Sequence, residues 1–157
     1  MKRFVLAGGL ATLLSVGAFA GSASAVPFGG HMWGTGFGAF IGQVSSTTFN
    51  GSTEIVNEHI STSLRGVLTG AVNEYGAETV NTIAETSSWG FTGTISVLTS
   101  CGRLNETIID SGEGSFAGNL FVGGGEIRGL GPQSLTIDYS QIGSNFTYSA
   151  RWSCPNF

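Results

Sequence analysis

Basic side chains are scarce in this 157-residue sequence, which has a formal net charge of −4. Its one lysine is Lys2. Beyond residue 3, the sequence has ten carboxylates and only four scattered basic residues, Arg65, Arg103, Arg128 and Arg151. A nucleic-acid-binding protein needs clustered basic side chains to displace counterions from phosphates, and docking on anionic lipid by charge needs a similar cluster. The sequence therefore predicts no nucleic-acid partner.

Signatures of hydrolytic and zinc chemistry are also missing. Only two histidines occur, His31 and His59. The pattern Gly-x-Ser-x-Gly is absent beyond residue 25, and His59 lacks the second histidine of a zinc-protease helix. The sequence thus assigns no catalytic residue, and we expect a binding or structural protein rather than an enzyme.

The first 25 residues have the layout of a secretory signal peptide. Lys2 and Arg3 are followed by an apolar run, which ends in the small residues Ala23-Ser24-Ala25. We expect cleavage before Val26, and hence a protein that is secreted or held in the cell envelope. Beyond this point no apolar run reaches the roughly eighteen residues that a transmembrane helix requires, so we expect none in the mature chain.

Cysteine occurs only twice, at Cys101 and Cys154. An oxidising compartment permits disulfides, and a pair of cysteines leaves no odd thiol. A zinc site would need histidines at ligand spacing from these cysteines, and neither His31 nor His59 is near them in the sequence. The sequence therefore predicts one disulfide, Cys101 to Cys154.

Alternation of apolar and polar residues is the strongest structural signal. It runs through WGFTGTISVL, SLTIDY and NFTYSARWSC, at residues 89–98, 134–139 and 145–154. A period of two indicates half-buried antiparallel strands. Together with weaker strands between glycine-rich breaks, it predicts an all-β protein, either an antiparallel β-sandwich or a small closed β-barrel, of about eight short strands.

The expected organisation is one β domain over residues 35–157, preceded by a glycine-rich lead-in over residues 26–34. The lead-in is either flexible or a first strand with tight bends. One segment, STEIVNEHISTSLR at residues 52–65, leaves a short helix open because Val56, Ile60 and Leu64 recur every four residues.

Glycine is concentrated in SGEGSFAGNLFVGGGEIRGLGP, residues 111–132. A phosphate-binding loop needs glycines at fixed spacing followed by a helix. That spacing is absent here, and the two glycines and the proline after Glu126 make a helix improbable. The stretch therefore predicts a hairpin, with strands over 116–122 and 126–130 and the three glycines between them as its loop.

Carboxylates form two groups along the chain, Glu74 with Glu78, and Glu106 with Asp110 and Glu113. We expect these acids to face water, where they keep a surface without lysine soluble. An acid–base enzyme needs paired carboxylates, and Ca²⁺ takes carboxylate oxygens. Asp110 and Glu113 are therefore the candidate metal ligands, with Ca²⁺ as the one cofactor considered.

Trp33 is the candidate for ligand contact. Trp89 and Trp152 lie on the apolar faces of their expected strands, whereas the glycine-rich surroundings of Trp33 give it no obvious partner strand. Aromatic rings stack on sugars and other neutral polar ligands. We therefore expect a secreted or cell-envelope β-rich binding or structural module with an unidentified ligand, for example a glycan.

Two alternative functions stay open at this point. One is a small secreted enzyme that uses paired carboxylates in a barrel mouth. The other is a β-barrel inserted in the cell envelope, which the terminal Phe157 suggests, although Pro155 interrupts the final strand.

Overall fold

The computed structural model describes residues 26–28 and 31–154, so the expected signal peptide lies outside the described residues. No helix in this part of the chain is long and apolar enough to cross a membrane. The strands are β1 (Val26–Phe28), β2 (His31–Asn50), β3 (Thr53–Gly66), β4 (Thr69–Asn81), β5 (Thr86–Thr99), β6 (Gly102–Ala117), β7 (Leu120–Gly129), β8 (Thr136–Ile142) and β9 (Asn145–Trp152). The expected all-β class is confirmed.

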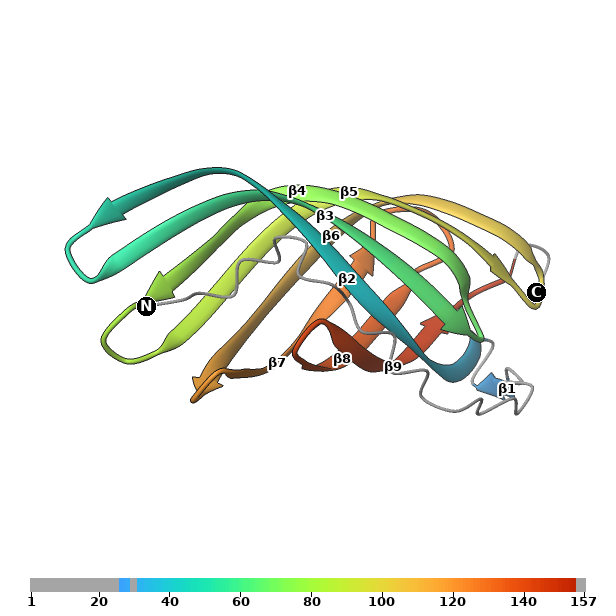
Figure 1. The fold of residues 1–157 in the computed structure, drawn as a ribbon. Coiled ribbons are helices and arrows are strands. Elements are labelled where there is room, and N and C mark those ends of the chain that lie inside the picture. Colours follow the sequence, from blue (N-terminus) through green and yellow to red (C-terminus); the bar gives the residue numbers. More distant parts are fainter. Residues whose placement is uncertain (1–25, 29–30, 155–157) are drawn as a thin grey trace.

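The strands form one antiparallel sheet that closes on itself (Figure 1). Each strand from β2 to β8 pairs with the next one along the chain, and β9 also pairs with β2. The closing register joins Met32 to Trp152 and Ala39 to Asn145. The short β1 pairs with the first residues of β2. Of the two expected architectures, the structure is the closed barrel.

The three strands with the clearest alternation are confirmed as β5, β8 and β9. In β9 the apolar positions face inward, and Phe146, Tyr148, Ala150 and Trp152 are all buried. The segment for which a helix stayed open is the strand β3, in which buried residues alternate with more exposed ones. An apolar spacing of four suits a strand as well as a helix, because every second residue of a strand shares a face.

The N-terminal lead-in belongs partly to the sheet. β2 begins at His31, and Gly34 lies in a buried position against Val67. Residues 31–34 are therefore the beginning of β2, the first long strand. This outcome matches the second of the two alternatives for the lead-in, a first strand.

The glycine-rich stretch does form a hairpin, but the expected position of its loop was wrong. β6 ends at Ala117 and β7 begins at Leu120, so the loop is the pair Gly118–Asn119. Gly118 has a φ of +65°, which glycine adopts without strain at the first loop position of a type II′ turn. Because the loop has only two residues, the three glycines at 123–125 lie inside β7.

Inward-facing glycines leave room for aromatic rings on the neighbouring strand. At each of five cross-strand pairs, an added Cβ would lie closer to the ring than real Cβ atoms come. These pairs are Gly36 with Tyr148, Gly38 with Phe146, Gly76 with Phe91, Gly112 with Trp89, and Gly125 with Tyr139. These five glycines therefore shape the interior of the barrel, because large rings need small neighbours at a tightly curved wall.

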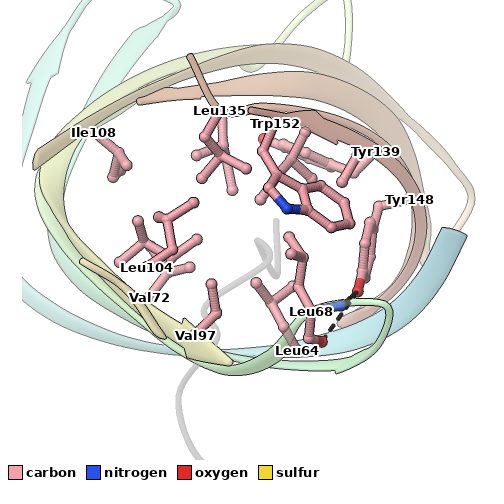
Figure 2. Close-up of a cluster of buried hydrophobic side chains, with 14 of the residues drawn as sticks. Leu64, Leu68, Val72, Val97, Leu104, Ile108, Leu135, Tyr139, Tyr148 and Trp152 are labelled. Carbon is pink, nitrogen blue, oxygen red and sulfur yellow. Dashed lines mark hydrogen bonds between the residues drawn. The ribbon is translucent and has the colours of Figure 1, made fainter. Parts of the chain in front are cut away.

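An apolar core fills one end of the barrel, shown in Figure 2. Leu64, Leu68, Leu104 and Trp152 are among its fully buried side chains. The Tyr148 hydroxyl accepts a hydrogen bond from the Leu68 N–H at 3.1 Å and lies 2.8 Å from the Arg65 carbonyl, to which it can donate. This tyrosine therefore fastens the turn between β3 and β4 to the interior.

The predicted disulfide is confirmed at the same end. The Cys101 and Cys154 sulfurs are bonded at 2.06 Å, with a Cα separation of 5.8 Å. Cys101 lies in the turn between β5 and β6, and Cys154 follows β9. The opposite end, where β2 turns into β3, β4 into β5, β6 into β7 and β8 into β9, carries no such crosslink among the described residues and is called the mouth below.

Candidate functional site

A cavity of about 40 Å³ lies inside the barrel, between the apolar core and the mouth. Of its lining residues on β4 and β5, Glu78 and Trp89 lie nearest to the mouth-end turn and Glu74 lies deeper. The core residue Val72 lies deeper still. Four acids line the cavity, Glu58, Glu74, Glu78 and Asp110. Its aromatic lining consists of Phe40, Trp89, Phe91, Phe121 and Tyr139.

These acids face inward because they share a strand face with apolar residues. Glu74 and Glu78 alternate in step with Val72 and Val80 on β4, and all four side chains are buried. A strand places every second residue on the same side, so burying the valines also buries the acids. The expectation that the acids face water is therefore wrong for Glu74, Glu78, Glu106 and Asp110.

Glu74 and Asp110 form a carboxyl pair across the cavity. Burial raises the pKa of Glu74 to about 9, and the Asp110 charge and a hydrogen bond between the two carboxyls act in the same direction. Burial raises the pKa of Asp110 only to about 6, because hydrogen bonds from Tyr139, Glu74 and Trp89 lower it. Between these values the shared proton stays on Glu74 and Asp110 carries the charge.

Asp110 is held by a short chain of hydrogen bonds. The Tyr139 hydroxyl donates to Asp110 Oδ1 at 2.7 Å, and the Trp89 indole N–H donates to the Tyr139 oxygen at 2.9 Å. Burial and the Asp110 charge raise the pKa of Tyr139, so this hydroxyl stays protonated. The chain fixes both aromatic rings against the acid that carries the charge.

Glu58 and Glu78 form a second carboxyl pair. Burial raises the pKa of Glu58 to about 8, with further contributions from the Glu78 charge and a hydrogen bond to Glu78. Glu58 is therefore protonated at neutral pH. The interior thus holds two acid pairs, each of which needs a proton to stay together without a cation.

No basic side chain among the described residues lies in the barrel interior. Arg65, Arg103, Arg128 and Arg151 are all exposed. His59 lies on the outer face of β3, where its ring stacks on that of Tyr75 at 4.3 Å. Glu58, Glu74 and Asp110 therefore have no counter-ion among the described residues.

Several carboxyl oxygens in the cavity lack a donor. Both oxygens of Glu74 and Oε2 of Glu58 are buried, and no N–H or O–H group of the described residues donates to them. In the pair with Asp110, the protonated Glu74 is itself the donor. A buried oxygen without a donor destabilises the fold. Such oxygens mark the part of the cavity that is best suited to accept hydrogen bonds from a ligand.

A scan against models of protein families finds none that matches the chain. A search of curated proteins finds no match either. Function is therefore inferred from the geometry of the site.

The structure separates the two expected calcium ligands. Asp110 is 2% exposed and faces the cavity, whereas Glu113 is exposed on the outer face of the same strand. Residues three apart on a strand point to opposite sides, so the two carboxylates do not meet. The described residues contain no group of three or more His, Cys, Asp or Glu that could hold a metal ion.

The remaining predicted residues lie outside the cavity. Trp33 is 40% exposed on the outer face of β2, opposite Arg151. Glu106 is buried, but its Oε1 accepts a hydrogen bond from the Gln133 N–H at 3.1 Å, so it holds the segment between β7 and β8. Neither residue contributes to the carboxyl and aromatic cavity.

Sequence reasoning missed Glu58, Trp89 and Tyr139 as parts of the site. The signal for Glu58 was its place in the alternation with Val56 and Ile60, which puts an acid on an apolar face. The signal for the rings was weaker, since an inward aromatic residue in a core and one in a pocket look alike in sequence.

A second hollow, of about 870 Å³, lies near the mouth and is lined by residues of β3 to β7. Its lining is Thr53, Thr79, Asn81, Thr86, Ser87, Ser88, Glu113, Gly114, Ser115, Val122, Gly123 and Gly124. None of these is an aromatic residue on which a sugar ring could stack. The inner cavity is the better candidate for a specific site.

Proposed function

We propose that the protein is a secreted or cell-envelope binding protein whose ligand enters through the barrel mouth and is held in the carboxyl and aromatic cavity. One observation carries the proposal: buried, donor-less oxygens of Glu58 and Glu74 converge with aromatic rings in one cavity. A ligand site of this kind combines apolar walls with a few convergent polar groups.

Stability alone does not account for these acids. Burying a carboxyl group without a basic partner is unfavourable, and valine or leucine in the place of Glu74 would extend the apolar core. Residues that oppose stability in this way cluster at functional sites. Their presence in a cavity therefore supports binding over a purely structural role.

The outer face of β5 favours a barrel in water over one inserted in a lipid bilayer. Outward positions of β5 are Thr86, Ser88, Gly90, Thr92, Thr94, Ser96 and Leu98. An inserted barrel presents an apolar band of about 25 Å to lipid, and these positions, of which five carry a hydroxyl group, do not contribute to one. We therefore place the envelope-inserted alternative behind the binding protein.

A second candidate function is proton transfer to a bound substrate. The Glu74 and Asp110 carboxyls have pKa values of about 9 and about 6, and such a separation is typical of an acid and a base. Their direct hydrogen bond leaves less than the roughly 5 Å that glycosidases keep between carboxyls. This pair therefore suits an isomerisation better than glycoside hydrolysis, and loss of turnover in Asp110→Asn would test it.

The binding proposal is tested by a ligand screen with a site-specific signal. Neutral sugars, carboxylic acids, alcohols and amines are screened by thermal shift, and hits are added to ¹⁵N-labelled protein. The chain has three tryptophans, whose indole signals are assigned with Trp33→Phe and Trp89→Phe.

We expect a true ligand to raise Tm and to shift the Trp89 indole signal while leaving that of Trp33 in place. A ligand that raises Tm and moves only the Trp33 signal would place binding on the outer surface. Such a result, or a screen in which no class of compound moves Trp89, would contradict the proposed site.

A further inference from the structure

We infer that the ligand of the inner cavity is a small organic cation with a primary ammonium head group. This inference rests on the proposed binding function and adds the chemical class of the ligand. It replaces the neutral polar ligand that the sequence suggested.

The first support is the sign of the charge. Glu58, Glu74 and Asp110 line the cavity without a basic side chain beside them among the described residues, whose four arginines are all exposed on the outside. In a low-dielectric interior, uncompensated carboxyls attract a cation and repel an anion. A carboxylate or phosphate ligand therefore does not fit this site.

The second support is the hydrogen-bonding pattern. Both oxygens of Glu74 and Oε2 of Glu58 accept no hydrogen bond from an N–H or O–H group of the described residues. A primary ammonium group carries three N–H donors and no acceptor, so it matches a site made of acceptors. A sugar hydroxyl carries only one donor, and its own lone pairs would lie against the carboxyl oxygens, which are also acceptors.

The third support is the lining of aromatic rings around the acids. Trp89 and Phe91 on β5, Phe121 on β7 and Tyr139 on β8 border the same cavity as Glu74. The face of an aromatic ring attracts a cation, most strongly when both are shielded from water. The rings therefore favour a cation without competing for its N–H donors.

The size of the cavity limits the head group. A volume of about 40 Å³ holds roughly three water molecules. An ammonium group with its first methylenes fits this space, whereas a sugar ring does not. The rest of the ligand then extends towards the mouth.

Binding of a cation displaces protons from the acid pairs. The titratable groups that share the cavity with Glu74 are Asp110 on β6, Tyr139 on β8, Glu58 on β3 and Glu78 on β4, and no positive group faces it among the described residues. Once an ammonium group donates to these oxygens, the shared protons are no longer needed. Affinity therefore rises with pH as long as the amine keeps its charge.

The test is titration calorimetry on the full mature protein, with butylamine and phenethylamine as ligands. Their neutral counterparts, butanol and phenethyl alcohol, have similar shapes but no charge. We expect the amines to bind at pH 8 at least about tenfold more tightly than the alcohols, because a hydrogen bond to a charged group is the stronger kind. At pH 6 we expect affinity for the amines to fall about tenfold or more, with proton release at pH 7 that appears as a buffer-dependent heat.

The variant Glu74→Gln keeps the shape of the protonated acid, but it cannot lose a proton and so cannot become negatively charged when an amine binds. We expect it to weaken amine binding about tenfold or more, and Glu58→Gln to act in the same direction. Glu113→Gln is the matched control, because Glu113 lies three residues from Asp110 on the same strand but outside the barrel. Its affinity should equal that of the wild type.

Three outcomes would overturn the inference. Equal binding of alcohols and amines, tighter binding of Ca²⁺ than of any amine, or amine binding that Glu74→Gln leaves unchanged each exclude an ammonium site at these acids. A neutral ligand that shifts the Trp89 signal in such a case would leave the proposed function standing and remove only the ligand class.

Discussion

Single glycine residues determine where aromatic rings can lie inside the barrel. Gly112 and Gly125 are inward positions without a side chain, and the Trp89 and Tyr139 rings lie over them from neighbouring strands. The same two rings form the hydrogen-bond chain to Asp110. The glycines thus matter to the site through the rings that they admit.

Gly112→Ala is expected to destabilise the protein by about 1–3 kcal/mol, because the new methyl group overlaps the Trp89 ring and overpacking carries such a cost. Gly90→Ala is the matched control. Gly90 is exposed on β5, and an added Cβ there meets nothing within 4 Å. Urea denaturation of both variants measures the difference, and equal midpoints would refute the assigned role of Gly112.

At the scale of elements, the turns at the mouth share one design. Three of its four hairpins have two-residue loops that begin with glycine: Gly51–Ser52, Gly118–Asn119 and Gly143–Ser144. All three glycines have a positive φ, near +62° to +65°. Such pairs are recognised hairpin signals, and the pair Gly118–Asn119 was overlooked in the sequence because the three glycines at 123–125 were assigned as the loop.

The opposite end of the barrel relies on a covalent connection between elements. The disulfide ties the turn between β5 and β6 to the chain after β9, across a sequence separation of 53. Crosslinking a loop of this length restricts the unfolded chain. The end that holds the apolar core is therefore also the end that is crosslinked.

Reduction of the disulfide, or Cys101→Ser with Cys154→Ser, is expected to lower the free energy of unfolding by about 2–4 kcal/mol. Urea denaturation with and without dithiothreitol measures the loss. The double variant serves as control, since the reductant should leave its midpoint unchanged. A wild-type midpoint that does not respond to the reductant would contradict the stabilising role of this bridge.

At the scale of the whole molecule, the buried acids couple folding to pH. Glu58 and Glu74 have pKa values near 8 and 9 in the folded protein, above the ordinary value of 4.5, and Asp110 is raised from 3.8 to about 6. The folded state therefore holds protons that the unfolded chain has already lost. Their contribution to stability is complete below about pH 4 and is lost as pH rises through the folded-state values.

We therefore expect the wild type to be more stable at pH 5 than at pH 8. The slope is at most about 1.4 kcal/mol per pH unit for each proton that only the folded state retains. Glu58→Gln with Glu74→Gln should flatten the profile, whereas Glu113→Gln should leave it unchanged. Urea denaturation across this pH range provides the measurement, and a wild type that gains stability towards pH 8 would refute the burial of protonated acids.

The sequence by itself determined the features that depend on local order and covalent chemistry. The period of two in β5, β8 and β9 follows from the geometry of a strand, and Cys101 had one possible partner in Cys154. The same alternation already placed Glu58, Glu74 and Asp110 on the faces of their apolar neighbours. Because alternate residues of a strand share a face, the sequence already indicated that these acids are buried.

Only the tertiary structure decided that the sheet closes and that acids from three strands meet. Closure depends on the pairing of β2 with β9, which are separated by most of the chain. Glu58, Glu74 and Asp110 lie on β3, β4 and β6, and they converge only because the closed wall curves their faces towards one axis. Alternation fixes the face of a residue along a strand, but the partner across the interior is set by long-range pairing.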